Sequence, residues 1–158
     1  MSAEARPKIH HEEVPHTDGR RELRVFYVSN DVATREALVG VARELRGFGL
    51  CECELQTVQQ VLAEILNNVV EHACADDTSA LIELRVILEE SIIHAQVIDS
   101  GRPMPGGTLP EPAPPHPTDL PEGGFGWCII RAMADRISYV REGGRNRLSV
   151  SLRRDRKP

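Results

Sequence analysis

Prolines divide this chain more sharply than any other feature of its sequence. Eight of the eleven prolines lie between residues 103 and 121, where the chain reads PMPGGTLPEPAPPHPTDLP. Proline has no backbone N–H and a fixed φ, so this segment fits neither a core helix nor a central strand. A loop of about twenty residues inside a compact domain is typically a functional lid or a disordered segment. We therefore expect residues 103–123 to interrupt the regular structure as a lid or a disordered loop.

The size and composition are those of one ordinary globular domain. The chain has 158 residues, of which 41% are hydrophobic and 27% charged, enough for a real core. Aromatic residues make up only 4% and the formal net charge is −5, which argues against direct nucleic-acid binding. We see no apolar signal segment and no run of about 18 apolar residues, so we expect a cytoplasmic protein that does not enter a membrane.

Hydrophobic periodicity predicts an α/β fold on either side of the proline-rich loop. Residues 1–22 show no periodicity and are expected to be a flexible arm, followed by one domain over 23–158. The order is strand, two helices, a strand hairpin, the loop, a third helix and two strands. We expect a two-layer sandwich, with a mainly antiparallel mixed sheet covered on one face by helices. The predicted strands are 23–28, 80–89, 91–99, 136–142 and 147–154, and the predicted helices 32–45, 55–73 and 127–135.

The second predicted helix carries a polar row beside its apolar stripe. Glu64, Asn68 and His72 recur at every fourth position, roughly 60–80° round the helix from the stripe centred near Ile65. An amide oxygen there suits a hard cation such as Mg²⁺, and a carboxylate suits proton transfer from a hydroxyl group. Taken alone, the row fits equally well a solvated shoulder of the helix.

Two glycine-containing segments lie at places where a ligand would approach the backbone. Asp99 ends an apolar strand and Gly101 follows, so a carboxylate and a missing Cβ would face a flat ligand with an amino group. Gly124, Phe125 and Gly126 stand directly before the third helix, where free N–H groups favour phosphate. Each segment alone also fits a plain turn.

Together these segments resemble the N, G1 and G2 boxes of the GHKL-type (Bergerat-fold) ATPases. The order E-x-x-x-N, D-x-G and then G-x-G before a helix is most similar to that of the anti-sigma-factor serine kinases. The similarity covers about residues 23–153. It implies a histidine-kinase-like ATPase domain that binds ATP and Mg²⁺ and whose lid is the 103–123 segment.

The resemblance also implies a role for each matching residue. Asn68 would bind the Mg²⁺ on the ATP phosphates, and Glu64 would be the general base for a serine hydroxyl. Asp99 would hold the adenine amino group, with Gly101 close to the base, and His72 would lie beside the nucleotide.

The lid residues Gly124, Phe125 and Gly126 would wrap the phosphates. The implied substrate is an anti-sigma-factor antagonist, and the competing partner is a sigma factor held inactive by binding. Members of this family are commonly homodimers, so a homodimer is expected.

The chain departs from the family pattern at two positions. Pro103 stands where the G1 box often has a second glycine, which would stiffen the start of the lid. Gly123 stands where a basic residue often precedes the lid G-x-G, so a phosphate contact would come from Arg102, Arg131 or a residue of a partner.

Three other functions are compatible with parts of the sequence. A histidine-kinase catalytic domain needs a helical phosphoacceptor region, for which 22 residues before the first strand are too few, and tends to carry Asn where this chain has Glu64. A nucleotide-gated binding or scaffold protein would keep the site but not phosphotransfer. A metal or redox protein would use Cys51, Cys53, Cys74 and His72, although the spacing is poor for zinc.

Overall fold

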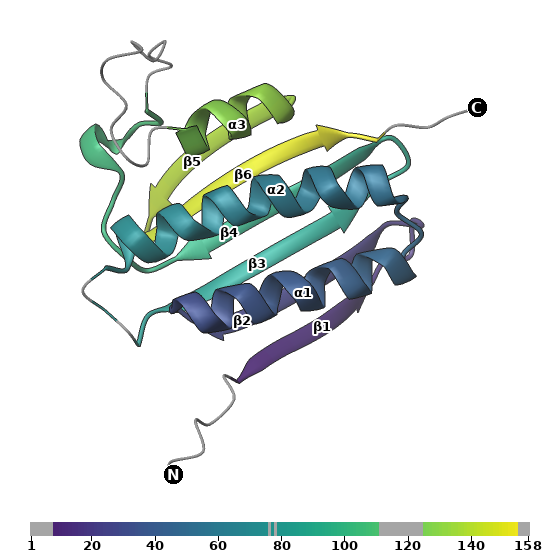
Figure 1. The fold of residues 1–158 in the computed structure, drawn as a ribbon, viewed down its shortest axis with the longest axis horizontal. Coiled ribbons are helices and arrows are strands. Elements are labelled where there is room, and N and C mark those ends of the chain that lie inside the picture. Colours follow the sequence, from purple (N-terminus) through teal and green to yellow (C-terminus); the bar gives the residue numbers. More distant parts are fainter. Residues whose placement is uncertain (1–7, 76, 78, 111–124, 155–158) are drawn as a thin grey trace.

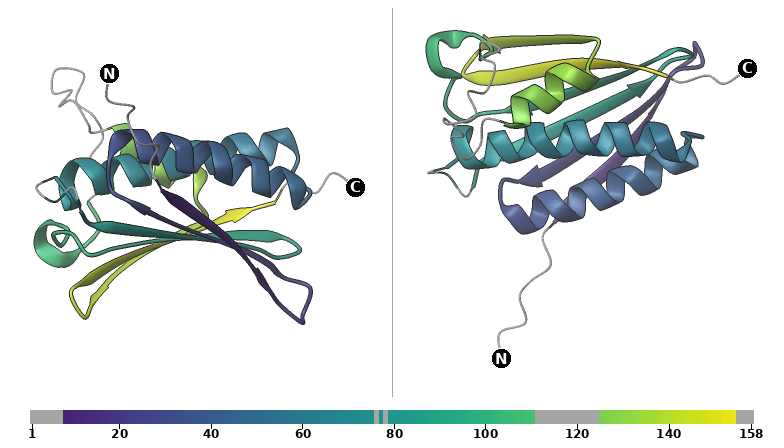
Figure 2. Two further views of the ribbon diagram at one scale, coloured as in Figure 1. Left: turned by 90° about the horizontal axis from the view of Figure 1, so that it is seen from below. Right: turned by 45° about the horizontal axis from the view of Figure 1, so that its top comes forward.

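The computed structural model describes residues 8–75, 77, 79–110 and 125–154. The described residues form one six-stranded sheet with helices packed against one of its faces (Figure 1). Figure 2 shows the helices on the same side of the sheet, which confirms the predicted two-layer α/β fold. The strands are β1 (Ile9–Pro15), β2 (Arg21–Val28), β3 (Leu81–Leu88), β4 (Ile92–Asp99), β5 (Arg136–Glu142) and β6 (Arg145–Arg153). The helices are α1 (Asp31–Gly47), α2 (Glu52–Asn68) and α3 (Phe125–Met133), with a π-helical turn at Val69–Ala73 and a 3₁₀ turn at Pro105–Gly107.

The sheet is antiparallel at every one of its described pairings. Its strand order is β1-β2-β3-β4-β6-β5, so β6 inserts between β4 and β5. At the centre, Leu84 pairs with Val25 on one side and Val97 on the other, and all three side chains are buried. Side chains alternate between the faces of a strand, so the same strands bury one row under the helices and leave the other row near solvent.

Helix α1 begins and packs as its sequence predicts. The Asn30 side chain caps the helix by accepting a hydrogen bond from the Ala33 N–H at 2.7 Å. Ala33, Ala37 and Val41 occupy every fourth position of the helix and are buried against the sheet. The small alanines let the helix backbone lie close to the strands.

Helix α2 begins three residues before the predicted start because Cys51 caps it. The Cys51 sulfur accepts from the Glu54 N–H, and the Glu54 carboxylate accepts from the Cys51 N–H at 3.1 Å. Arg154, beyond the end of β6, also donates to Glu54 at 3.0 Å. Burial opposes ionisation of Glu54, but the hydrogen bonds from Arg154 and Cys51 outweigh it, and the pKa of this carboxyl is lowered.

The N-terminal segment corrects one prediction. Residues 1–22 were expected to form a flexible arm, but Ile9–Pro15 is a strand paired with β2 along its whole length. His11 faces α1, where its ring lies so close to Gly40 that a Cβ there would meet the His11 Cε1 atom at 2.5 Å. The polar, histidine-rich composition hid the strand, because β1 is an edge strand with only half-buried side chains.

Candidate functional site

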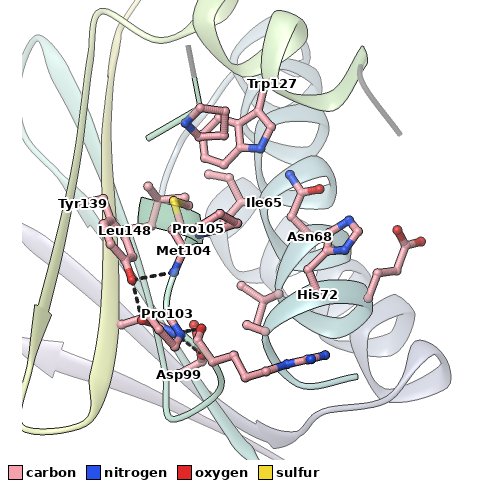
Figure 3. Close-up of a pocket in the computed structure, with 16 residues that line it drawn as sticks. Ile65, Asn68, His72, Asp99, Pro103, Met104, Pro105, Trp127, Tyr139 and Leu148 are labelled. Carbon is pink, nitrogen blue, oxygen red and sulfur yellow. Dashed lines mark hydrogen bonds between the residues drawn. The ribbon is translucent and has the colours of Figure 1, made fainter. Parts of the chain in front are cut away.

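A cavity of about 580 Å³ lies where the C-terminal end of α2 meets the end of β4 and the β5–β6 hairpin (Figure 3). Ile65, Val69 and Leu148 give it apolar walls, and Trp127 of α3 covers one side. A largely apolar cavity of this size with a few polar groups is typical of a small-molecule site. Of the ligand contacts predicted from the sequence, Asn68, His72, Asp99 and Arg102 line it.

Asp99 is the buried charge of the cavity. Asp99 is the last residue of β4, its side chain faces the helices, and it is only 3% exposed. Its Oδ1 atom accepts hydrogen bonds from the Gly101 N–H at 2.8 Å and from Asn146 Nδ2 at 2.9 Å. Burial raises the pKa of the Asp99 carboxyl above its usual value, although these hydrogen bonds and the charges of Arg141 and Arg145 oppose the shift.

Asn146 connects Asp99 to the segment that follows β4. It lies opposite Asp99 in the β4–β6 register and is buried. Its Nδ2 atom also donates to the Arg102 carbonyl oxygen at 2.8 Å, and its Oδ1 atom accepts from the Tyr139 hydroxyl at 2.6 Å. Tyr139 in turn accepts from the Met104 N–H at 3.0 Å. The last hairpin therefore fixes the backbone of residues 102–104 at the edge of the cavity.

Gly101 is needed by the protein itself. A Cβ at this position would lie 2.3 Å from the carbonyl oxygen of Ala73, which also accepts from the Arg102 N–H at 2.8 Å. Gly101 is not among the residues that line the cavity. The expectation that its missing Cβ gives room to a flat ligand is therefore corrected, because that room is taken by the end of the π-helical turn.

The π-helical turn sets the positions of the residues after Asn68. The Cys74 N–H donates to the Val69 carbonyl oxygen at 2.8 Å, five residues back, where the sequence predicted an uninterrupted α-helix over 55–73. Such turns widen a helix locally and are frequent at functional sites. Asn68 and the exposed His72 both line the cavity.

Asn68 presents an amide group that the protein does not satisfy. Its Nδ2 atom is buried and has no hydrogen-bond partner among the described residues. A buried amide without a partner costs free energy, so it is commonly explained by a ligand, an ion or water. The amide lies on the helix side of the cavity, away from Asp99 at the end of β4 (Figure 3).

Glu64 does not line the cavity with Asn68 and His72. It lies on α2, one turn before Asn68, where it is half-buried and close to Gly126 at the start of α3. A Cβ added at Gly126 would lie 2.7 Å from Glu64 Oε2 and 3.7 Å from Asn68 Nδ2. The glycine thus leaves room for this carboxylate at a helix N-terminus, where the helix dipole favours negative charge.

Only part of the predicted lid can be compared with the structure. Residues 103–110 border the cavity through Pro103, Met104, Pro105 and Pro110, and Arg131 of α3 donates to the Pro110 carbonyl oxygen. Arg102 lines the cavity, whereas Arg131 does not. Gly123 and Gly124 lie outside the described residues, as do residues 111–122. Phe125 is the first residue of α3.

The cysteines do not converge on one site. Cys51 and Cys53 lie at the N-terminal end of α2 and are exposed, whereas the buried Cys74 follows the turn at the helix's other end. Within the described part of the chain, no group of three or more His, Cys, Asp or Glu side chains is arranged to hold a metal ion. No helix there has both the length and the apolar composition to cross a membrane.

Sequence reasoning missed three contributors to the cavity. Trp127 and Tyr139 were not assigned to the site, and Asn146 was left without a role. Asn146 and Leu148 alternate with exposed residues on β6, which puts both on the helix-facing side. That alternation was visible in the sequence, but the pairing of β6 with β4 that brings Asn146 opposite Asp99 was not.

This fold and site define a class of protein. Residues 28–152, well over half of the chain, match the family model of the histidine kinase-like ATPase domain. The chain belongs to the histidine kinase-like ATPase family, which confirms the GHKL-type resemblance found in its motifs.

Its relatives carry more particular names. It is similar to the anti-sigma F factor of Geobacillus stearothermophilus, with 28% identity over 121 residues that cover 75% of this chain and 82% of the relative. It is equally similar to the serine-protein kinase RsbW of Oceanobacillus iheyensis, with 28% identity over 128 residues (75% of this chain, 81% of the relative).

Among solved structures, it resembles the RsbU and RsbW domains of a Mycobacterium tuberculosis protein. That match has a TM-score of 0.63 and 18% identity, and it covers 86% of this chain and 33% of the larger one. At this identity, the match supports the fold.

Proposed function

We propose that this chain binds ATP with Mg²⁺ in the cavity and transfers the γ-phosphoryl group to a serine of an anti-sigma-factor antagonist. The observation that carries the proposal is one cavity with a buried carboxylate at the sheet side and an unsatisfied amide at the helix side. An adenine nucleotide has matching groups, an amino group on its base and a metal-bound phosphate chain at its other end.

At the base end, Asp99 would accept a hydrogen bond from the adenine amino group. The apolar walls of Ile65, Val69 and Leu148 would exclude water from the base, which strengthens that bond. Trp127 and Met104 give further apolar surface for the purine.

At the phosphate end, the Asn68 amide fits a magnesium ligand. Mg²⁺ prefers oxygen ligands and usually takes few from the protein, the others coming from phosphates and water. The atom left without a partner among the described residues is the donor Nδ2, and the amide oxygen would be the metal ligand. When bound, Mg²⁺ would neutralise charge on the phosphates.

Glu64 would orient the serine hydroxyl and accept its proton. Its carboxylate lies beside Gly126 at the start of α3, close to Asn68 but outside the cavity. In this proposal, the serine approaches from the α3 side, where the residues before Phe125 would meet the phosphates. Most of the catalysis would be positioning and electrostatic stabilisation, as in other phosphoryl transfers.

The names of the relatives suggest the partners. An anti-sigma factor binds a sigma factor, and a serine-protein kinase phosphorylates a protein substrate, so we assign both activities to this chain. Antagonist and sigma factor would compete for the kinase, and phosphorylation of the antagonist would leave the kinase free to hold the sigma factor. We propose a cytoplasmic homodimer as the working form.

The test is transfer of label from ATP to a candidate antagonist in the presence of Mg²⁺. Wild-type protein should label a serine of the antagonist, and Glu64→Ala should abolish the labelling while ATP binding remains. Glu36→Ala changes an exposed acid on α1 and serves as the matched control, which should label normally. Full labelling by Glu64→Ala would remove Glu64 from the mechanism.

A second candidate is a nucleotide-gated binding protein without phosphotransfer. The position of Glu64 outside the cavity favours it, since a protein that only binds nucleotide needs Asp99 and Asn68 but no base. In that case ATP binds, partner capture depends on ATP, and no antagonist is labelled.

A further inference from the structure

The two oxygens of the Asp99 carboxylate are used differently by the protein. Oδ1 accepts both internal hydrogen bonds, from the Gly101 N–H and from Asn146 Nδ2. Asp99 lines the cavity, and its Oδ2 atom accepts no hydrogen bond from the described residues. The base end of the cavity therefore offers one committed acceptor oxygen and one available acceptor oxygen.

The orientation of the Asn146 amide is fixed by its other partners. Arg141 Nη1 lies 2.8 Å from Asn146 Oδ1, and a guanidinium group has donors only. The atom facing Arg141 must therefore be the amide oxygen, which leaves the NH₂ group facing Asp99 and the Arg102 carbonyl oxygen. The donation to Asp99 Oδ1 thus follows from the chemistry of the neighbours.

Tyr139 supports the same arrangement from the adjacent strand. Because the Met104 N–H donates to the Tyr139 oxygen, the hydroxyl hydrogen is free to point at Asn146 Oδ1, 2.6 Å away. Asn146 is then held by two donors on its oxygen and three acceptors near its nitrogen, the third being the Gly101 carbonyl oxygen at 3.5 Å. A side chain held in this way cannot turn toward a ligand, so it acts on the ligand through Asp99.

We propose that Asn146, held by Tyr139, is a positioning residue that makes the base end selective for adenine over guanine. The proposal rests on the proposed function, since it concerns the base of the same nucleotide. Together with the Gly101 N–H, Asn146 occupies Oδ1 and leaves Asp99 a single available acceptor oxygen, which matches the one amino group on the pairing edge of adenine.

Guanine presents a different pattern on that edge. Its ring N–H and its amino group are adjacent donors, which match the two oxygens of an unoccupied carboxylate in a bidentate pair. With Oδ1 taken, one guanine donor would be buried without an acceptor, and such an unpaired group is costly. Sites that hydrogen-bond a ligand in this way discriminate more strongly than apolar pockets do.

The test compares ATP and GTP affinity of the full chain by calorimetry with Mg²⁺. Wild-type protein should bind ATP at least about tenfold more tightly than GTP, the factor expected from one unpaired donor. Asn146→Ala removes one of the two hydrogen bonds to Oδ1, which opens this oxygen to a guanine donor, and should reduce this ratio about tenfold. Asn146→Thr keeps a hydroxyl donor and should preserve most of the ratio.

Two further variants separate selectivity from folding. Tyr139→Phe removes the hydroxyl that donates to Asn146 and accepts from the Met104 N–H but leaves the ring, so it should lower the ATP-to-GTP ratio with little change in the thermal midpoint. Ser149→Ala changes a residue of β6 that bonds Gln96 and does not line the cavity, and should leave the ratio unchanged.

The outcomes distinguish this proposal from the proposed function. An unchanged ratio in Asn146→Ala, or an equal loss in Asn146→Ala and Asn146→Thr, overturns the role of Asn146 while nucleotide binding stands. Equal binding of ATP and GTP by the wild type also overturns the role of Asn146 while nucleotide binding stands. If the wild type binds neither nucleotide, the proposed function fails and this proposal falls with it.

Discussion

Gly101 has no side chain at the point where the chain after β4 passes close to the π-helical turn. A Cβ there would meet the backbone carbonyl of Ala73 at 2.3 Å, and a backbone atom cannot move aside as the end of a side chain can. We expect Gly101→Ala to lower the free energy of unfolding by about 1–3 kcal/mol, the usual cost of forcing an extra group into a packed site.

Denaturant unfolding measures this loss, and Gly47→Ala is the matched control. Gly47 ends α1, has open space around its Cβ position and does not have a positive φ. Alanine there should leave stability unchanged or raise it slightly, because alanine favours helix more than glycine does. Equal stability of Gly101→Ala and wild type would contradict the close approach to Ala73.

The buried Asp99 carboxylate should lower the free energy of unfolding at neutral pH, where it is charged. Burial raises its pKa in the folded state, so this group favours folding most below its unfolded pKa of about 3.9. That contribution falls as the pH rises through the folded pKa. Asp99→Asn keeps an acceptor for Gly101 and Asn146 but carries no charge.

We therefore expect Asp99→Asn to gain unfolding free energy relative to wild type as the pH rises from about 4 to neutrality. Chemical denaturation of both proteins across this pH range gives the difference. A difference that stays constant with pH would mean that Asp99 is not desolvated in the folded state.

Among the elements, β1 makes a contact with α1 that should depend on pH. His11 packs against Gly40 of α1, and its Nδ1 atom is buried without a partner among the described residues. Burial lowers the pKa of His11, as do His10 and Arg43, while Glu44 opposes them. The neutral ring therefore stabilises the strand above the unfolded pKa of about 6.5, and the contribution is lost as the pH falls through the folded pKa.

Amide hydrogen exchange of β1 should accordingly become faster, relative to β3, as the pH falls from about 7 to 5, after correction for intrinsic rates. His11→Gln removes the titrating ring and should remove most of this change. If β1 protection falls equally in His11→Gln, the effect comes from another group, and the docking of His11 is not the cause.

The sequence predicted the elements well wherever a local pattern determines them. The helical spacing of Ala37, Val41 and Leu45, after the capping side chains of residues 29–31, was enough to predict α1. The prediction from sequence failed where an element depends on a contact with a distant segment or on an unusual residue. The examples are the cysteine cap of α2 and the polar edge strand β1. The π-helical turn was also missed, because nothing in the local sequence separates it from the end of an α-helix.

For the candidate site, sequence motifs identified Asn68, His72 and Asp99, which the fold brings to one cavity. They did not identify Asn146 or Tyr139, since these meet Asp99 and Met104 only through the β4–β6–β5 pairing. They also gave Gly101 a ligand-facing role, because the close approach of Ala73 depends on the turn after α2.

In the whole molecule, a single bound nucleotide has to span the cavity from Asp99 on β4 to Asn68 on α2. The two ends can be tested separately with parts of the ligand. Adenosine binding should be weakened by Asp99→Ala and unchanged by Asn68→Ala. Binding of magnesium tripolyphosphate should be weakened by Asn68→Ala and unchanged by Asp99→Ala. Gly47→Ala provides a control remote from both ends.

The most direct measurement is the calorimetric affinity of the full chain for ATP with Mg²⁺, in wild type, Asp99→Ala, Asn68→Ala and the double variant. We expect clear binding by the wild type, a loss of about tenfold or more in each single variant, and none detectable in the double variant. Absence of ATP binding by the wild type, or equal binding by the double variant, would contradict the account.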